Sequence, residues 1–243
     1  MPENHFRERV AERYDETTAE RFDPAIVEPV VDVLAELAGD GRALELGVGT
    51  GRIAIPLARR GVEVHGIDLS EAMVAKLRAK PGAERIGVTI GDFATTKVEG
   101  SFSVAYLVFN TIENLTTQDE QVACFENAAS HLEPGGSFVI EVTVPDLRRL
   151  LPGETFHVFE VTDTHLGIDE YDVVNQGLVS YHYYRTADGR YEQSSGPFRY
   201  VWPSELDLMA RIAGLTLAGR WAGWKREPFT GESREHVSVW TKS

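Results

Sequence analysis

The chain is poor in cysteine and in long apolar segments. Cys124 is the only cysteine among 243 residues, so an intrachain disulfide is impossible. A single cysteine is consistent with a protein of a reducing compartment. No run approaches the roughly 18 apolar residues of a membrane-spanning helix, and the start of the sequence, Met-Pro-Glu-Asn-His, lacks the features of a signal peptide. These absences predict a cytoplasmic protein with one large domain, which is long enough to bury its own core.

Positive charge is also scarce. The 24 Lys and Arg residues are outnumbered by 38 Asp and Glu residues, which gives a formal net charge of −14. Binding to nucleic acids and to anionic lipid surfaces depends on clusters of Lys and Arg. We therefore expect neither a nucleic-acid partner nor a membrane partner.

Several catalytic and metal-binding patterns are missing. The chain has no G-x-S-x-G and no G-x-x-x-x-G-K-[ST], so neither an α/β-hydrolase nor a P-loop enzyme is supported. His157, His165 and His182 lie on expected strands without a close pairing such as H-x-x-x-H, and no metal site is predicted. Cys124 and His131 would be roughly 10 Å apart along one helix, too far for a nucleophile and its base. Cys124 is therefore interpreted as a core residue.

Strand-like and helix-like segments alternate through the first part of the chain. Strands are expected near residues 42–47, 62–67, 86–91, 102–109 and 136–143, and helices near 24–38, 51–60, 70–80 and 117–132. Two further strands are expected at 215–221 and 236–241. This order predicts an α/β fold with a doubly wound, mostly parallel sheet of seven strands.

Residues 150–202 break this alternation. Four strand-like segments, at 156–166, 170–174, 178–186 and 191–202, are separated by turn signals at Gly167, at residues 175–177 and at Asp188-Gly189. We interpret them as a small antiparallel insertion after strand five, which divides the main domain into residues 1–149 and 203–243. A helix is expected to follow, with Ser204 as its N-cap and Gly214 as its stop.

The most informative motif is the segment Leu-Glu-Leu-Gly-Val-Gly-Thr-Gly at residues 44–51. Its glycines let a ligand approach the backbone at a strand-to-helix turn, and Asp68, which ends the next strand, can bind both hydroxyls of a ribose. The third glycine of the NAD fingerprint is displaced, because Arg52 stands there. Glu45 would also repel a pyrophosphate, so an adenosine cofactor with a cationic end fits better.

These residues resemble motif I and the acidic loop of class I S-adenosylmethionine-dependent methyltransferases. The resemblance extends to Gly91-Asp92-Phe93 after the third strand and to Leu-Glu-Pro-Gly-Gly at residues 132–136, before strand five. It implies a Rossmann-like sheet whose last two strands pair antiparallel. The Asn-Pro-Pro-Tyr motif is absent after strand four, where Phe109-Asn110-Thr111-Ile112 stands, which argues against methylation of nucleic-acid bases or glutamine amides.

The resemblance also implies a cofactor site for S-adenosylmethionine. Tyr14 would close the pocket and bind the methionine carboxylate, Asp92 or its neighbouring amides would bind adenine, and Phe109 and Asn110 would contact the adenine or sulfonium and the methionine amine. The expected cofactor-binding residues are Tyr14, Glu45, Gly47, Val48, Gly49, Gly51, Asp68, Leu69, Met73, Gly91, Asp92, Phe93, Phe109 and Asn110.

The function predicted from these features is in-line transfer of a methyl group from S-adenosylmethionine to a small organic acceptor. Two alternatives stay open: an NAD-dependent oxidoreductase, and a non-catalytic module that binds S-adenosylmethionine. The nature of the acceptor atom and the choice between monomer and homodimer are also open.

Residues for the acceptor are less clearly indicated. Glu113 and Glu141, each after a central strand, are candidates for accepting a proton from the acceptor, or for orienting it. Tyr181 and Tyr183 share one strand face of the insertion and could contact the acceptor. The insertion would then form a lid over the substrate, although its aromatic residues could instead hold it on the main domain or form a dimer interface.

Overall fold

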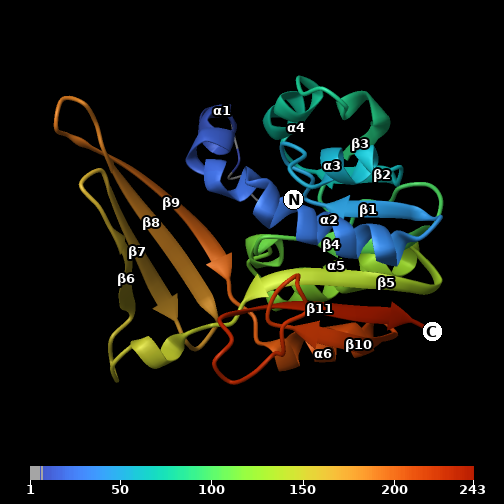
Figure 1. The fold of residues 1–243 in the computed structure, drawn as a ribbon. Helices are drawn as coiled ribbons and strands as arrows, with labels where there is room; N and C mark the ends of the chain where they lie inside the picture. The colour runs from blue at the N-terminus through green and yellow to red at the C-terminus, as the bar shows by residue number, and fades with distance from the viewer. Residues whose placement is uncertain (1–5, 7) are drawn as a thin grey trace.

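The computed structural model describes residue 6 and residues 8–243, so the start of the chain, on which the signal-peptide interpretation rests, lies outside the described residues. Seven strands form one sheet in the order β10-β11-β5-β4-β1-β2-β3 (Figure 1). Strands β1 to β5 are parallel to one another, and β11 is antiparallel to both β5 and β10. The strands are β1 (Arg42–Leu46), β2 (Glu63–Asp68), β3 (Ile86–Ile90), β4 (Phe102–Leu107), β5 (Leu132–Thr143), β10 (Leu215–Trp221) and β11 (Glu235–Lys242). The predicted α/β fold class is confirmed.

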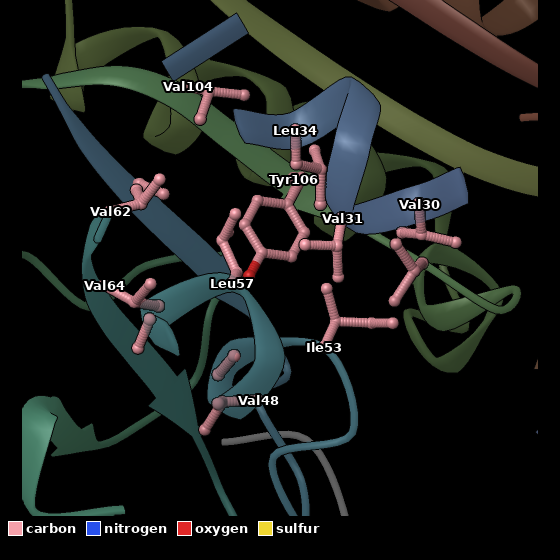
Figure 2. Packing of buried hydrophobic residues seen from close by; sticks show 14 of the residues in the cluster. Val30, Val31, Leu34, Val48, Ile53, Leu57, Val62, Val64, Val104 and Tyr106 are labelled. Carbon is pink, nitrogen blue, oxygen red and sulfur yellow. The ribbon is translucent and has the colours of Figure 1, made fainter. Parts of the chain in front are cut away.

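Helices cover both faces of this sheet. One apolar cluster lies between the sheet and helices α2 and α3, and a second lies between the other face and helices α5 and α6. Figure 2 shows part of the first cluster, where Tyr106 packs among Val31, Leu34 and Leu57. The helices are α1 (Glu8–Thr17), α2 (Pro24–Ala38), α3 (Ala54–Arg59), α4 (Glu71–Arg78), α5 (Gln118–His131) and α6 (Pro203–Ile212). No helix in residues 8–243 is long and apolar enough to span a membrane.

Local chemistry explains where several helices begin. Thr117 and Glu120 form a reciprocal capping box at the start of α5. Helix α3 begins at Ala54, later than expected, because Gly51 has a φ of +80° and the glycine turn continues beyond it. The predicted N-cap of α6 was wrong: Trp202 holds that position and Ser204 is already helical, since Pro203 occupies the first turn, where its missing N–H costs nothing.

The insertion forms a separate antiparallel sheet in the order β6-β7-β8-β9, which projects from the main domain in Figure 1. Its strands are β6 (Phe156–Val161), β7 (His165–Asp172), β8 (Gly177–Arg185) and β9 (Tyr191–Arg199). The expected turn at Gly167 was wrong, because the chain turns at residues 162–164 and Gly167 lies within β7. A Cβ at Gly167 would lie 2.3 Å from the ring of Phe159, so this glycine makes room for a cross-strand aromatic side chain.

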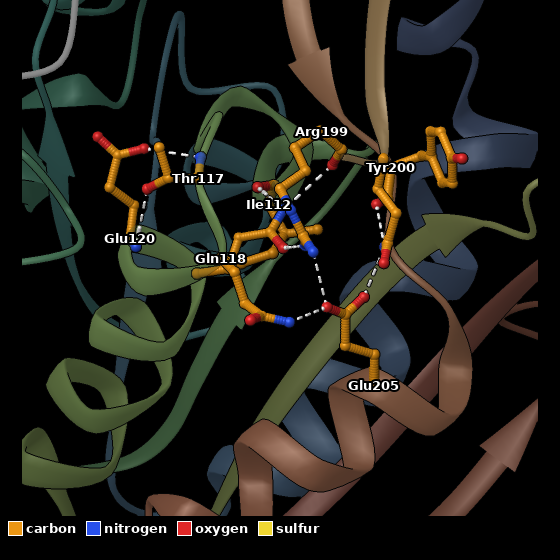
Figure 3. A network of polar contacts seen from close by, with 9 residues as sticks. Ile112, Thr117, Gln118, Glu120, Arg199, Tyr200 and Glu205 are labelled. Atoms are coloured by element: carbon orange, nitrogen blue, oxygen red, sulfur yellow. Dashed lines mark hydrogen bonds and ion pairs between the residues drawn. The ribbon is translucent and has the colours of Figure 1, made fainter. Parts of the chain in front are cut away.

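A buried polar network fastens the insertion to the main domain (Figure 3). The Arg199 guanidinium, at the end of β9, donates to Gln121 on α5 and lies 2.7 Å from the Glu205 carboxylate on α6. Gln118 and Gln176 each donate to Glu205 at 2.7 Å. Burial raises the pKa of Glu205, but these hydrogen bonds outweigh it and the pKa is lowered. The network joins β9, α5 and α6 at the base of the insertion.

Arg199→Met is therefore expected to destabilise the protein by about 3 kcal/mol, because it leaves the Glu205 carboxylate buried without its cation. Chemical denaturation at pH 7 would measure the loss. Arg190→Met is the matched control, since Arg190 pairs with Asp188 at the surface, where 84% of its side chain is exposed. Equal stabilities of the two variants would contradict this role. Because the folded-state pKa of Glu205 is below its ordinary value of 4.5, the stabilisation should be complete above that pH and be lost as the pH falls through the lowered pKa.

Candidate active site

A cavity opens at the carboxyl ends of β1, β2 and β4, where open α/β sheets bind their ligands. Its volume is about 740 Å³ when the open solvent space at its mouth is included. Its walls come from the glycine turn after β1, the end of β2 with the start of α4, the turn after β3, the short 3-10 helix η3 (Thr111–Asn114) after β4, and the N-terminal segment. Of the expected cofactor residues, it brings together Tyr14, Gly47, Gly49, Asp68, Leu69, Met73, Asp92 and Phe93.

The glycine turn and Asp68 form one unit. Asp68 Oδ2 accepts a hydrogen bond from the Gly49 N–H at 2.6 Å, and Oδ1 accepts one from the Ser70 N–H at 2.8 Å. Burial raises the pKa of Asp68 although both hydrogen bonds act to lower it. Each oxygen retains a lone pair, so the carboxylate can still accept from two ribose hydroxyls. Gly47 has a φ of +79°, and a Cβ there would lie 2.7 Å from the Thr111 methyl group, so any side chain would intrude on the cavity wall.

Helix α1 closes one side of the cavity. Tyr14 lines it, and burial raises the pKa of its phenol. The next residue, Asp15, accepts from the Thr50 hydroxyl at 2.6 Å and pairs with Lys80 at 2.5 Å. This contact ties α1 to the glycine turn itself, so Tyr14 is held in place by its neighbour.

Glu45 lies outside this cavity. Its side chain is buried on the face of the sheet that α2 and α3 cover, where the Tyr106 hydroxyl donates to its carboxylate at 3.0 Å. Burial raises the pKa of Glu45 to about 8. Because strand residues alternate between faces, Glu45 faces the cluster beneath α2 and α3, and the expectation of a direct cofactor contact is corrected.

Three expected cofactor residues support the cavity without lining it. A Cβ at Gly66 would lie 2.5 Å from the Cβ of Val48, so Val48 packs on the neighbouring strand. A Cβ at Gly51 would lie 2.9 Å from Leu77 on α4, and one at Gly91 would lie 2.2 Å from the Thr96 hydroxyl. Val48, Gly51 and Gly91 therefore allow close packing behind the wall.

Phe109 and Asn110 form a turn after β4, which ends two residues earlier than expected, and Glu141 on β5 contacts this turn. Phe109 and Asn110 both have positive φ, near +57°. Glu141 accepts from the Phe109 N–H at 2.8 Å, and the Asn110 side chain accepts from the Thr143 N–H at 2.8 Å. The guanidinium of Arg21 lies over the Phe109 ring, 4.4 Å from its centre. Glu141 and Asn110 thus fix the backbone beside η3, and none of the three residues lines the cavity.

Glu113 lies on η3 but faces the insertion. It is only 6% exposed, and burial, followed by repulsion from Asp169 on β7, raises its pKa to about 8 against a hydrogen bond from Thr143. Burial also raises the pKa of Asp169. His157, opposite Asp169 on β6, acts to lower the Asp169 pKa, but no Lys or Arg among the described residues does so for either carboxyl. The buried Glu113 carboxyl and the half-buried Asp169 carboxyl therefore lie close enough to interact at the junction between the two sheets.

The register of the insertion decides which side chains face the main domain. Asp169 pairs with Ser180 and His165 pairs with Tyr184, so these residues share one face. Asp169 on this face acts to raise the pKa of Glu113. Burial raises the pKa of Tyr184, and the nearby Arg13 of α1 acts to lower it. We call this side of the insertion the inner face.

Tyr181 and Tyr183 lie on the opposite, outer face. The Tyr181 hydroxyl donates to Glu170 on that face at 2.9 Å. The expectation that these two tyrosines contact the acceptor is corrected, because the alternation of a strand directs Ser180, His182 and Tyr184 inward instead.

Five further residues line the cavity that were not predicted from the sequence: Phe6, Ser70, Thr111, Asn114 and Leu115. The last three follow strand four at the edge where ligands bind, but the predicted cofactor contacts ended at Asn110. No sequence pattern around Asp169 predicts a role in the site, because Asp169 comes near Glu113 only in the folded protein.

Comparison with known proteins defines the class. Residues 43–136 match the methyltransferase domain family. The CcbJ methyltransferase from Streptomyces caelestis is 39% identical in sequence, and the superposition covers 96% of each chain with a TM-score of 0.86. A methyltransferase from Clostridium acetobutylicum that depends on S-adenosylmethionine is 14% identical with a TM-score of 0.77, covering 97% of this chain and 98% of that one. The chain belongs to the class I S-adenosylmethionine-dependent methyltransferases.

Among curated proteins, the chain is similar to the cypemycin N-terminal methyltransferase from a Streptomyces species. The two are 29% identical over 248 residues, which cover 93% of this chain and 96% of the relative. The protein is thus a methyltransferase that uses S-adenosylmethionine, and the NAD and binding-module alternatives are set aside. The cavity fits this cofactor, because Asp68 has free acceptor positions and the glycine turn leaves the space that side chains would fill.

Proposed function

We propose that this enzyme methylates an amine nitrogen of a small organic acceptor, with the insertion (residues 150–202) as the roof of the acceptor site. The observation that carries the proposal is the interacting pair Glu113 and Asp169, at the junction of the insertion and η3. An amine reaches the enzyme as an ammonium ion, and a cation between two carboxyl groups would offset the burial and the repulsion that raise the pKa of Glu113.

The location of η3 supports this assignment. Thr111 and Asn114 line the cofactor cavity, while Glu113 on the same short helix faces the insertion. One 3-10 helix would therefore separate the cofactor from the acceptor, with the amine near the open end of the cavity. Asp68 and Tyr14 would hold the cofactor on its side of this wall.

Bound S-adenosylmethionine supplies a methyl group on a sulfonium, which is a good leaving group. The protein has to bring the nitrogen into line with the methyl carbon, exclude water and remove one proton from the ammonium ion. Glu113 is suited to the last task, since a carboxyl group with a pKa of about 8 is, once ionised, basic enough to take a proton from an ammonium ion. The nitrogen lone pair freed in this way forms the new N–C bond as the C–S bond breaks.

The named relative agrees with an amine acceptor. The cypemycin N-terminal methyltransferase is named for an N-terminus, which is an amine, and it is similar over nearly its whole length. This likeness supports the choice of nitrogen over oxygen or carbon.

A screen with labelled S-adenosylmethionine would test the proposal. Matched acceptors that differ only in the reacting atom, such as primary amines against the corresponding alcohols and carboxylic acids, should be compared. We expect label transfer to amines alone. Transfer to alcohols or acids, with none to amines, would contradict it.

A further inference from the structure

Two histidines on the inner face of the insertion form a hydrogen-bonded chain with Glu160. His165 Nδ1 lies 2.8 Å from Glu160 Oε2, and His165 Nε2 lies 2.9 Å from His182 Nδ1. The two imidazole planes differ by only 7°. Tyr184 stacks on His165 with the ring centres 4.4 Å apart, and the Phe159 ring meets His182 edge-on at 5.5 Å. Both imidazoles are therefore held in fixed orientations.

The two hydrogen bonds of this Glu160–His165–His182 series fix the tautomer of each neutral imidazole ring. An ionised carboxylate can only accept, so Glu160 requires the proton of His165 on Nδ1. His165 Nε2 is then an acceptor and requires the proton of His182 on Nδ1. Burial, followed by the neighbouring His165, lowers the pKa of His182, which favours the neutral ring. The Nε2 atom of His182 is left with a lone pair.

The neighbouring serine makes only a long contact with this lone pair. Ser180 Oγ lies 3.4 Å from His182 Nε2 and shares its single proton with the Asp169 carboxylate, so a stronger donor can replace it. Ser194 and Gly196, on the facing positions of β9, are small. The charged and titratable groups around the pair are His157 and Glu160 on β6, Asp169 on β7, Glu192 on β9 and, near Tyr184, Arg13 on α1.

We propose that His182 Nε2 accepts a hydrogen bond from a second donor, a hydroxyl or amide N–H, of the methyl acceptor. This inference rests on the proposed function, since the ammonium ion is assigned to Glu113 and Asp169. His182 lies two residues along β8 from Ser180, the partner of Asp169, so it shares the inner face with both. The acceptor is therefore an amine that also carries a hydrogen-bond donor. His182 selects it from amines of the same length that lack the donor.

A cycle of two enzymes and two acceptors tests the contact. Aminobutanol, aminopentanol and aminohexanol are each compared with the alkylamine of the same length, using the wild type and His182→Phe. The variant should raise KM for the best amino alcohol roughly 10-fold, as for loss of one hydrogen bond, and change KM for its alkylamine partner much less. Tyr183→Phe, one residue away on the outer face, is the matched control and should leave both values unchanged.

A second measurement does not depend on turnover. Histidine labelled with ¹⁵N should show His182 as the Nδ1–H tautomer, assigned by the signal that is lost in His182→Phe. Glu160→Gln should weaken this preference, because an amide can also donate to His165. Binding of an amino alcohol should shift the His182 Nε2 signal.

The outcomes separate the two proposals. If no amine is methylated while S-adenosylhomocysteine still binds, the proposed function fails, and the tautomer still tests the histidine chain. If amines are methylated but His182→Phe affects both acceptors of a pair equally, the assignment of His182 is overturned. An Nε2–H tautomer of His182 in the wild type would overturn it as well.

Discussion

Asp68→Ala is expected to weaken binding of S-adenosylhomocysteine by about 10- to 100-fold. The carboxylate would accept two hydrogen bonds from the ribose, and such charge-assisted bonds are stronger than neutral ones. The substitution also frees the Gly49 and Ser70 N–H groups, which Asp68 holds at 2.6 and 2.8 Å, so the glycine turn loses its anchor on β2. Titration calorimetry would measure the change.

Glu63→Ala provides the control for this experiment. Glu63 begins the same strand at its far end, and its side chain is 67% exposed and paired with Arg42. Its removal should leave the affinity unchanged. A folded Asp68→Ala protein that bound S-adenosylhomocysteine as tightly as the wild type would refute the ribose contact.

Glu113→Gln is expected to lower kcat/KM for an amine acceptor by roughly 100-fold, because general-base catalysis typically contributes 10²- to 10⁴-fold. The amide keeps the shape of the carboxyl group but cannot take a proton. S-adenosylhomocysteine affinity should change little, since Glu113 faces the insertion and not the cofactor cavity.

The pH dependence gives a sharper form of this prediction. Glu113 has a pKa of about 8, so it is protonated below that pH and ionised above it. In the wild type, kcat/KM should contain a limb that rises through about pH 8, and the same acceptor assayed with Glu113→Gln should lack this limb. Profiles of the same shape would exclude Glu113 as the base.

Whereas kcat/KM should rise with pH, the free energy of unfolding should fall. The pKa of Glu113 is raised from 4.5 to about 8 on folding, so its protonated form is favoured in the folded state and stability is lost as the pH rises toward 8. Glu113→Gln should therefore raise the midpoint of thermal unfolding at pH 9 and have little effect at pH 4. A loss of stability at pH 9 would show that the carboxylate has a structural role instead.

The methyltransferase sheet, the glycine turn and the place of Asp68 could all be predicted from the amino-acid sequence. These features are local: each strand, turn or helix start is encoded in a short run of residues, and β-α alternation allows few arrangements of the strands. The same locality explains the boundary errors near Phe109 and Ser204, where backbone conformation depends on contacts with Glu141 and on Pro203.

Which side chains meet at the junction between the two sheets depends on tertiary packing. A shift of one residue moves a side chain to the other face of a sheet, so the pattern of tyrosines could not show that Tyr181 and Tyr183 face outward. The burial of Glu45 beneath α2 and the approach of Asp169 to Glu113 join segments far apart in the chain. Such contacts follow from how the two sheets pack, and no short run of sequence encodes them.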